Sequence, residues 1–432
     1  MTKTIGFDAA TAASLPGAPW LQEFRSAAAA QLASIQLPTE QEELWRYSRI
    51  DSFDLDSYLP FGGNDIAVPG TDTAPGGGPI AAEAGERSGL AVVHDGRVVH
   101  VELDAELAAR GVVLGEAATV SEGPLTTSFG RLTAQSPDAF TILHNAVVPG
   151  GAVVHVPAGV AVPKPIVIVH WCEGVGRASA PHTLVLAEPS SEVVVIERMS
   201  SPAGAHFVNA AAEFIVQQNA SVKYLSVQEH GRDTWQVSHQ RAEVDRDSQF
   251  HAAAVALGGT YARLRCEASL IGERADARQT AVYYGDRDQM LDFRTLQDHR
   301  APRTTSNLQF NGAVENQAAS VYSGMIRLHP EAQRSIAHQT NRNLLLTTQA
   351  RAESIPNLEI EANDVQCSHA STIGPIDEDQ LYYLATRGVS PRDAARLIVM
   401  GFFNGIFAAL PVPSMVDRLR SVVSEKVGRI DT

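Results

Sequence analysis

The chain contains 432 residues, of which 34 are basic and 49 acidic, so its formal net charge at neutral pH is −15. That charge repels phosphate backbones and anionic lipid, which argues against nucleic acid and membrane surfaces as partners. Hydrophobic residues make up 44% of the chain and charged residues 19%, a composition that excludes disordered and fibrous proteins.

Three cysteines, Cys172, Cys266 and Cys367, are too few and too far apart for a disulfide framework. The chain begins without the basic and apolar segments of a secretory signal. Its most apolar window, residues 397–410, is shorter than the roughly 20 residues that span a bilayer. We therefore expect a cytoplasmic protein.

Residues 1–89 are predicted to form an N-terminal helical region followed by a linker. Thr39 and Glu42 have the spacing of a helix capping box and precede a predicted helix at 43–47. Residues 64–89 are rich in Gly, Pro, Ala and Thr, which is typical of a flexible connection.

Residues 90–375 are predicted to be a β region. It begins with a hairpin, because two apolar runs flank Asp95 and Gly96. From about residue 150 onward, short β-branched runs alternate with small polar turns. The predicted strands are Ala152–Val156, Ile166–Trp171, Glu192–Glu197, Glu213–Val216 and Val222–Val227.

The turns of the β region recur at a long and regular interval. Their centres near Ser190, Asn219, Asp247 and Arg274 are separated by 29, 28 and 27 residues. A β-sandwich would show turns about every 8 to 12 residues, whereas a solenoid shows one longer period. The period favours a solenoid whose successive turns stack on one another.

Residues 376–432 are predicted to form a C-terminal helical domain. Asp377 and Ser390 have the positions of helix caps, and a last amphipathic helix follows Ser414. The apolar face from 398 to 407 is wider than one small terminal helix requires. We expect it to pack on the β region, with a partner docking beside it.

Several common catalytic motifs are absent: the chain has no phosphate-binding P-loop, no dinucleotide fingerprint, no zinc-protease motif and no serine nucleophile elbow. We therefore expect a protein that is not an enzyme, and any ATP hydrolysis would come from a partner.

Two of the three cysteines are predicted to be buried. Alternation along its strand predicts that Cys266 faces the core, and Cys172 ends an apolar run and should also be buried.

Cys367 and His369 are the candidate site residues. In the preceding strand the even positions are apolar, and both residues share the parity of Glu359 and Glu361. A strand that ran on would point the thiol and imidazole outward together, whereas a turn at 363–364 would reset the register.

The Cys367 thiol and the His369 imidazole are donors for a soft metal such as iron, and a thiolate can also transfer sulfur. Two donors are too few for an iron–sulfur cluster, which takes about four. A second chain or a bound sulfur species would have to supply the others. The alternative is that Cys367 and His369 are an incidental exposed pair without a binding role.

These residues carry a family likeness. The chain resembles the SufB/SufD family of iron–sulfur cluster assembly scaffolds in the segments Asn341–Leu346, Ile355–Ile360, Asp364–Ala370 and Asp379–Leu384. It is similar to the SufD type, because SufB-type members carry a cysteine just after the first of these segments and residues 347–354 contain none. The family motif often has Gly after the histidine, where this chain has Ala370.

The resemblance implies a right-handed parallel β-helix between helical ends. It implies pairing with a SufB-type subunit through the β-helix and docking of a SufC-type ATPase on the C-terminal helices. Whether the chain forms a homodimer when SufB is lacking is left open. His369 would assist binding of iron or of a transient cluster shared with SufB, and Cys367 would be a neighbouring thiol. The electron donor, a flavin included, is left open.

Two other classes of function are alternatives to a cluster assembly scaffold. A secreted β-helix enzyme acting on acidic carbohydrate would need a secretion signal and a basic groove, and the sequence shows neither. A self-sufficient metal-binding protein would need a complete donor set, against which the three separated cysteines argue.

Overall fold

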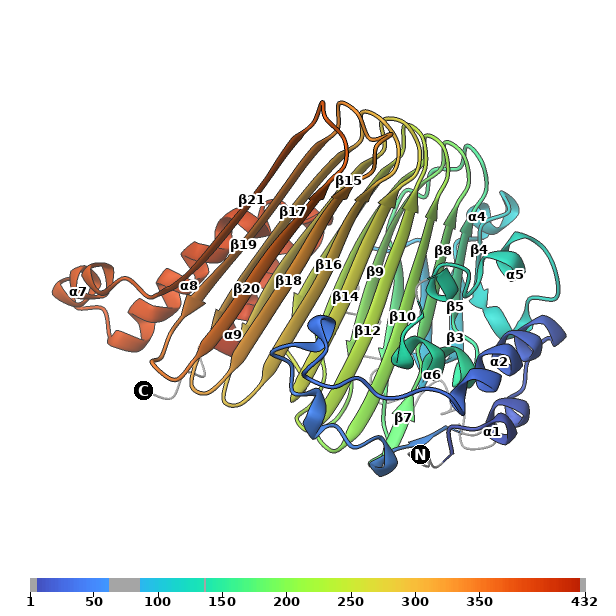
Figure 1. The fold of residues 1–432 in the computed structure, drawn as a ribbon, viewed down its shortest axis with the longest axis horizontal. Helices are drawn as coiled ribbons and strands as arrows, with labels where there is room; N and C mark the ends of the chain where they lie inside the picture. The colour runs from blue at the N-terminus through green and yellow to red at the C-terminus, as the bar shows by residue number, and fades with distance from the viewer. Residues whose placement is uncertain (1–5, 62–85, 136, 428–432) are drawn as a thin grey trace.

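The computed structural model describes residues 6–61, 86–135 and 137–427. The predicted linker at 64–89 lies almost wholly outside the described residues. Within them the protein is mainly β, a solenoid of about eight turns with helical regions at both ends (Figure 1). The predicted fold class is confirmed.

Two long sheets form the solenoid, and from residue 182 onward successive strands alternate between them and pair in parallel register. The first sheet contains, in spatial order, β20 (Arg351–Ile360), β18 (Ala319–Leu328), β16 (Met290–His299), β14 (Tyr261–Leu270), β12 (Thr234–Val244), β10 (His206–Val216), β8 (His182–Ala187), β5 (Ala152–Val156) and β4 (Val113–Glu116), with β7 (Arg177–Ser179) beside β10 and β1 (Leu59–Pro60) beside β7. The second contains β21 (Gln366–Pro375), β19 (Ile336–Leu345), β17 (Thr305–Val314), β15 (Asp276–Gly285), β13 (Gln249–Ala256), β11 (Ser221–Glu229), β9 (Glu192–Ser200), β6 (Ile166–Trp171), β2 (Gly89–His94) and β3 (Arg97–Leu103).

The four predicted turn centres lie at equivalent corners of successive solenoid turns and share one backbone conformation. Ser190, Asn219, Asp247 and Arg274 have φ of 60°, 59°, 59° and 61°. Such left-handed residues reverse the chain within a short corner, and Asn and Asp adopt this conformation more readily than most other residues with side chains. The period predicted from the sequence is therefore the period of the solenoid.

The register of the strands decides which side chains fill the interior. Because neighbouring strands pair residue to residue, each interior side chain stacks on the equivalent residue of the turn before. Gln240, Cys266 and Thr295 form one such column across β12, β14 and β16. Cys266 is buried, as its parity predicted, and Cys172 is buried as well.

The N-terminal region lies against the outer face of the first sheet (Figure 1). Its helices are α1 (Ala9–Ser14), α2 (Pro19–Leu32), α4 (Ala105–Ala109), α5 (Pro124–Ser128) and α6 (Ala139–Val147), with short 3-10 turns η1 (Glu43–Trp45), η2 (Ile50–Ser52), η3 (Leu55–Ser57), η4 (Ala117–Thr119) and η5 (Thr133–Gln135). The predicted hairpin is confirmed as β2 and β3, with positive φ at both Asp95 and Gly96.

The predicted helix at 43–47 is wrong, since the chain makes only the single turn η1 there. Glu42 does accept a hydrogen bond from the backbone N–H of Thr39, as a capping box requires. The helix then stops because Trp45 packs under the Arg263 guanidinium, 3.7 Å from the ring centre, and Tyr47 takes a left-handed conformation. Tertiary contact outweighs local propensity here.

Glu213 ties the N-terminal region to the outer face of the solenoid. Its carboxylate is fully buried and accepts hydrogen bonds from the backbone N–H groups of Gly130, Leu132 and Thr133, at 2.5 to 2.8 Å. His182 Nε2 lies 3.0 Å from the same carboxylate. Burial alone raises the pKa of Glu213, but these bonds and the His182 ring outweigh it and hold the pKa below its usual value.

Three helices follow the last strand: α7 (Glu378–Thr386), α8 (Pro391–Phe407) and α9 (Val416–Val427), with the 3-10 turn η6 (Pro413–Met415) before α9. Asp377 and Ser390 cap α7 and α8, as predicted. Helices α8 and α9 cover the outer face of the second sheet, where Val399, Phe403 and Val423 are fully buried. No helix in the described part of the chain is both long and apolar enough to cross a membrane.

We predict that Glu213→Ala lowers the free energy of unfolding by about 3 to 5 kcal/mol, because it leaves three buried N–H groups and His182 without their anion. Denaturation with urea measures this change. Glu243→Ala is the matched control on the next strand: Glu243 pairs with Arg131, which is more than one-third exposed, so a loss of about 1 kcal/mol or less is expected. Equal losses in the two variants would contradict the anchoring role of Glu213.

Candidate functional site

The C-terminal end of the solenoid is open. In β19 the interior residues Ala337, Gln339, Asn341 and Asn343 are buried, whereas in β21, which stacks on them, no residue is buried. Strands β20 and β21 each pair on one side only among the described strands. Their free edges carry unpaired backbone groups, and solenoids need a cap or a partner at such an end.

Apolar side chains are exposed at this end. Leu358 and Ile360 of β20 stack on the buried Ile326 and Leu328 of the turn before. No further turn among the described residues stacks on Leu358 and Ile360. Ile373 of β21 is exposed in the same way. Interior side chains are therefore presented to solvent, which is the pattern of a surface that another chain covers.

Cys367 and His369 lie in β21, at the open end. They pair in register with Ala337 and Gln339, both of which face the interior of the solenoid. The two side chains therefore share one face, as predicted, but that face is the interior one. His369 is exposed because no further turn among the described residues covers it.

Of the two alternatives that the sequence left open, the structure shows the turn that resets the register, so the two side chains do not point outward. Leu358 and Ile360, at even positions, face inward in β20, as the sequence predicted. The chain then turns between residues 361 and 365, and Ala362 is buried within that corner. The inward positions are odd when the next strand begins.

The surroundings of Cys367 make its thiol a poor nucleophile on its own. It is half-buried and packs against the apolar cluster that contains Ile326, Leu328 and Ala337. Burial raises the pKa of the Cys367 thiol. The neighbouring acidic groups point elsewhere, since Asp364 pairs with Arg334 at 3.5 Å and Glu359 with Arg327 at 2.8 Å.

The donor set at the open end is incomplete. No group of three or more His, Cys, Asp or Glu side chains that could hold a metal ion occurs among the described residues. A self-sufficient metal site of that kind is therefore not found in the described part of the chain. Cys367 and His369 can supply a thiol and an imidazole, and further donors have to come from outside.

A hollow of about 520 Å³ lies beside the open end, between α7, α8 and the ends of β19 and β21. Its walls include Leu344, Leu384 and Phe402. The same two helices carry large side chains that are more than half exposed, namely Tyr382 and Tyr383 of α7 and Leu397 of α8. The predicted packing of α8 on the β region is thus confirmed for one face of the helix, and another face stays uncovered.

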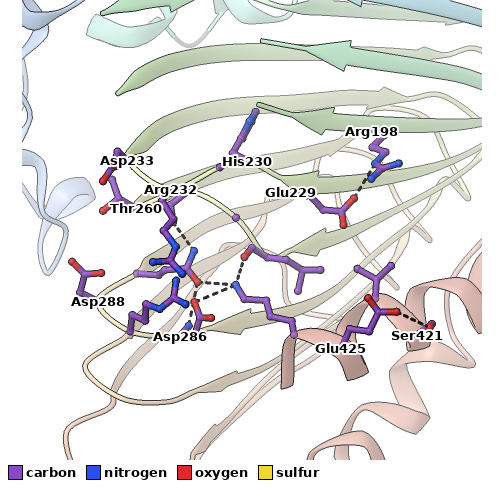
Figure 2. Close-up of a pocket in the computed structure, with 18 of the residues that line it drawn as sticks. Arg198, Glu229, His230, Arg232, Asp233, Thr260, Asp286, Asp288, Ser421 and Glu425 are labelled. Atoms are coloured by element: carbon purple, nitrogen blue, oxygen red, sulfur yellow. Dashed lines mark hydrogen bonds and ion pairs between the residues drawn. The ribbon is translucent and has the colours of Figure 1, made fainter. Parts of the chain in front are cut away.

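A second and larger hollow, of about 760 Å³, lies between α9 and the corners that follow β11, β13 and β15 (Figure 2). Side chains of both charges line it, among them Arg232, Asp233, Asp286 and Glu425. The mixture gives no preference for a ligand of one charge, so we interpret the hollow as the seam that seats α9.

Lys426 of α9 fixes this seam. Its ammonium group donates to the backbone carbonyls of Leu257 and Tyr284 and to Gln289 Oε1 at 2.7 Å, and it lies 3.6 Å from Asp286 Oδ1. A partly buried ammonium group needs several oxygen partners, and the end of β15 and the corners that follow β13 and β15 provide them. Sequence reasoning did not identify this contact, because its partners are separated from Lys426 by more than 130 residues.

Comparison with known proteins is consistent across the chain. Residues 170–402 match the family model described as SUF system FeS cluster assembly, SufBD core domain, and residues 12–168 match the SufBD protein N-terminal region. The chain is 30% identical to the iron-sulfur cluster assembly protein SufD of Bacillus subtilis over 78% of this chain and 79% of that protein. It is 30% identical to a SufBD family protein of Mycobacterium leprae, over 87% of this chain and 93% of the relative.

We predict that Lys426→Met loosens α9 from the solenoid, because the carbonyls and Asp286 lose their cation. The free energy of local opening should fall by about 2 kcal/mol, measured as faster amide hydrogen exchange across residues 416–427. Lys164→Met is the matched control. The Lys164 side chain is half exposed, and its ammonium group makes a weak ion pair, at 3.7 Å, with the exposed Glu86 carboxylate. Unchanged exchange in α9 would contradict the interpretation of the seam.

Proposed function

We propose a function from one premise: this chain belongs to the SufBD family of iron–sulfur cluster assembly proteins. It acts as a SufD-type scaffold subunit, whose open solenoid end pairs with a SufB-type subunit and there helps to hold a nascent cluster. The cluster is cargo that the complex assembles and passes on. The observation that carries the proposal is the last turn, with Cys367 and His369 on an interior face that no described residue covers completely.

Two properties of the last turn support pairing with a SufB-type chain. The edges of β20 and β21 are free to continue both sheets, and the solenoid of a related chain offers strands of matching spacing. Leu358, Ile360 and Ile373 supply apolar area that such a partner would bury. Two copies of this chain could meet through the same edge when SufB is lacking, which accounts for a homodimer as the substitute assembly.

The incomplete donor set supports a shared site. Iron accepts imidazole and thiolate donors, and the partner or a bound sulfide would complete the coordination. His369 is exposed and free to turn toward the partner, whereas the half-buried Cys367 needs a neighbouring cation or metal to lose its proton. We assign His369 the principal role and Cys367 a supporting one.

The C-terminal helices support docking of a SufC-type ATPase. The hollow between α7 and α8 and the exposed tyrosines of α7 offer an apolar and aromatic surface, which is typical of protein interfaces. Helix α8 packs on the second sheet, and the hollow is also lined by Leu344 and Pro375 at the ends of β19 and β21. Movement of a docked ATPase would thus reach the open end. The chain itself would act in the cytoplasm without catalysing a reaction.

We predict that His369→Ala leaves folding intact and removes cluster assembly. Substitution of an exposed side chain changes the free energy of unfolding by about 0.5 kcal/mol or less. The readout is the iron and sulfide content of the chain co-purified with its SufB-type and SufC-type partners. His338→Ala is the matched control, because His338 is exposed on the neighbouring strand but faces outward and contacts Ser368. Normal iron and sulfide in His369→Ala would contradict the role of His369.

We predict that Ile360→Asp prevents co-purification with the SufB-type partner, because it places a carboxylate within the apolar face that the partner would cover. Ile271→Asp is the control: Ile271 is similarly exposed, at 41% against 45% for Ile360, but lies at a corner far from the open end in the sequence and the sheet order. Equal recovery of the partner with both variants would place the interface elsewhere.

A further inference from the structure

Beneath His369 lies a buried amide that the proposed function does not use. The interior column of the second sheet that ends at His369 contains Gln279, Leu308 and Gln339 in successive turns. Gln339 is 1% exposed, and neither its Nε2 nor its Oε1 has a hydrogen-bond partner among the described residues. A buried amide without partners is unfavourable, so its presence directly under a candidate iron donor needs a reason.

Packing does not supply that reason. Leu308 occupies the same column one turn below and shows that an apolar side chain of similar size fits there. Leucine at 339 would avoid the cost of an unpaired amide. The glutamine is therefore explained better by a polar task at the open end than by stability.

The facing sheet leaves room for the Gln339 amide but provides no hydrogen-bond partner for it among the described residues. Gly324 lies across the interior, and a side chain there would meet Gln339, whose Nε2 is 2.5 Å from the position of a Cβ. The neighbouring polar groups are already engaged, since the hydroxyl of Tyr322 bonds to Thr295 and the amide of Asn341 bonds to Tyr283. The side chain above Gln339 in its own column is that of His369.

We propose that Gln339 is a positioning residue for His369. Strands in one sheet lie about 4.8 Å apart, so rotation of the exposed imidazole brings a ring nitrogen within reach of the amide. Gln339 Oε1 accepts a hydrogen bond from one ring N–H of His369, which fixes the tautomer and leaves the other ring nitrogen free to bind iron. Histidine ligands of metals are commonly held in this way by a second group. The inference rests on the proposed role of His369.

The test compares Gln339→Leu with Gln279→Leu in the full chain labelled with ¹⁵N-histidine. Gln279 is buried in the same column two turns below, with its own Oε1 unpaired, but has no contact with the open end. The ¹⁵N shifts of the His369 ring, assigned with His369→Ala, report its tautomer at a pH where imidazole is neutral. We expect one fixed tautomer in the wild type and in Gln279→Leu, and a mixture in Gln339→Leu.

A second variant guards against loss of folding. Gln339→Glu keeps an oxygen acceptor at the same place, so it should retain the fixed tautomer of the wild type. In the co-purified complex, iron content should fall about 10-fold in Gln339→Leu and stay normal in Gln279→Leu. The same tautomer mixture in the wild type and in both leucine variants would overturn the proposal.

The outcome separates this proposal from the one on which it rests. If His369→Ala abolishes cluster assembly while Gln339→Leu behaves as Gln279→Leu does, the function stands and the role of Gln339 is wrong. If His369→Ala assembles clusters normally, the function itself fails, whatever the tautomer shows.

Discussion

The structure depends on the in-register stacking of interior side chains from one turn of the solenoid to the next. Each turn buries its neighbour's side chains, and this burial supplies most of the favourable free energy of folding. The arrangement cannot end by itself, because the last turn has nothing above it. β20 and β21 are therefore the place where interior residues, apolar ones such as Ile360 and polar ones such as His369, come to the surface. The proposed function links stability to assembly at that place, since a partner that completed the stacking would also complete the proposed site.

The outer faces of both sheets are covered by other segments of the chain. The N-terminal region packs on the outer face of the first sheet, and α8 and α9 pack on the outer face of the second. Glu213 fixes the first of these layers and Lys426 the second, each through buried contacts with several backbone groups. These two charged residues thus hold the layers that cover the outer faces of the sheets. Among the described residues, the edges of β20 and β21 remain exposed.

The sequence predicted the features that repeat and missed those that depend on a single corner. The period was visible because left-handed corners select residues such as Asn219 and Asp247, and alternation within a strand placed Cys266 and Ile360 correctly. Simple continuation of the strand did not hold for Cys367 and His369, because the chain turns between β20 and β21 and the inward positions are odd when β21 begins. Gln339 was missed for a related reason, since nothing in its own strand shows that it lies under His369 one turn later.

The chemistry of the two donors explains why one of them dominates. An imidazole binds a metal in its neutral form and needs no proton to leave. A thiol binds only after it has lost its proton, and the burial of Cys367 against Ile326 and Leu328 makes that loss harder. Iron held first by His369 would itself lower the cost of ionising the thiol beside it, because a cation favours the thiolate. In the proposed function, iron would therefore meet the imidazole before the thiolate, because the last turn exposes His369 and half-buries Cys367.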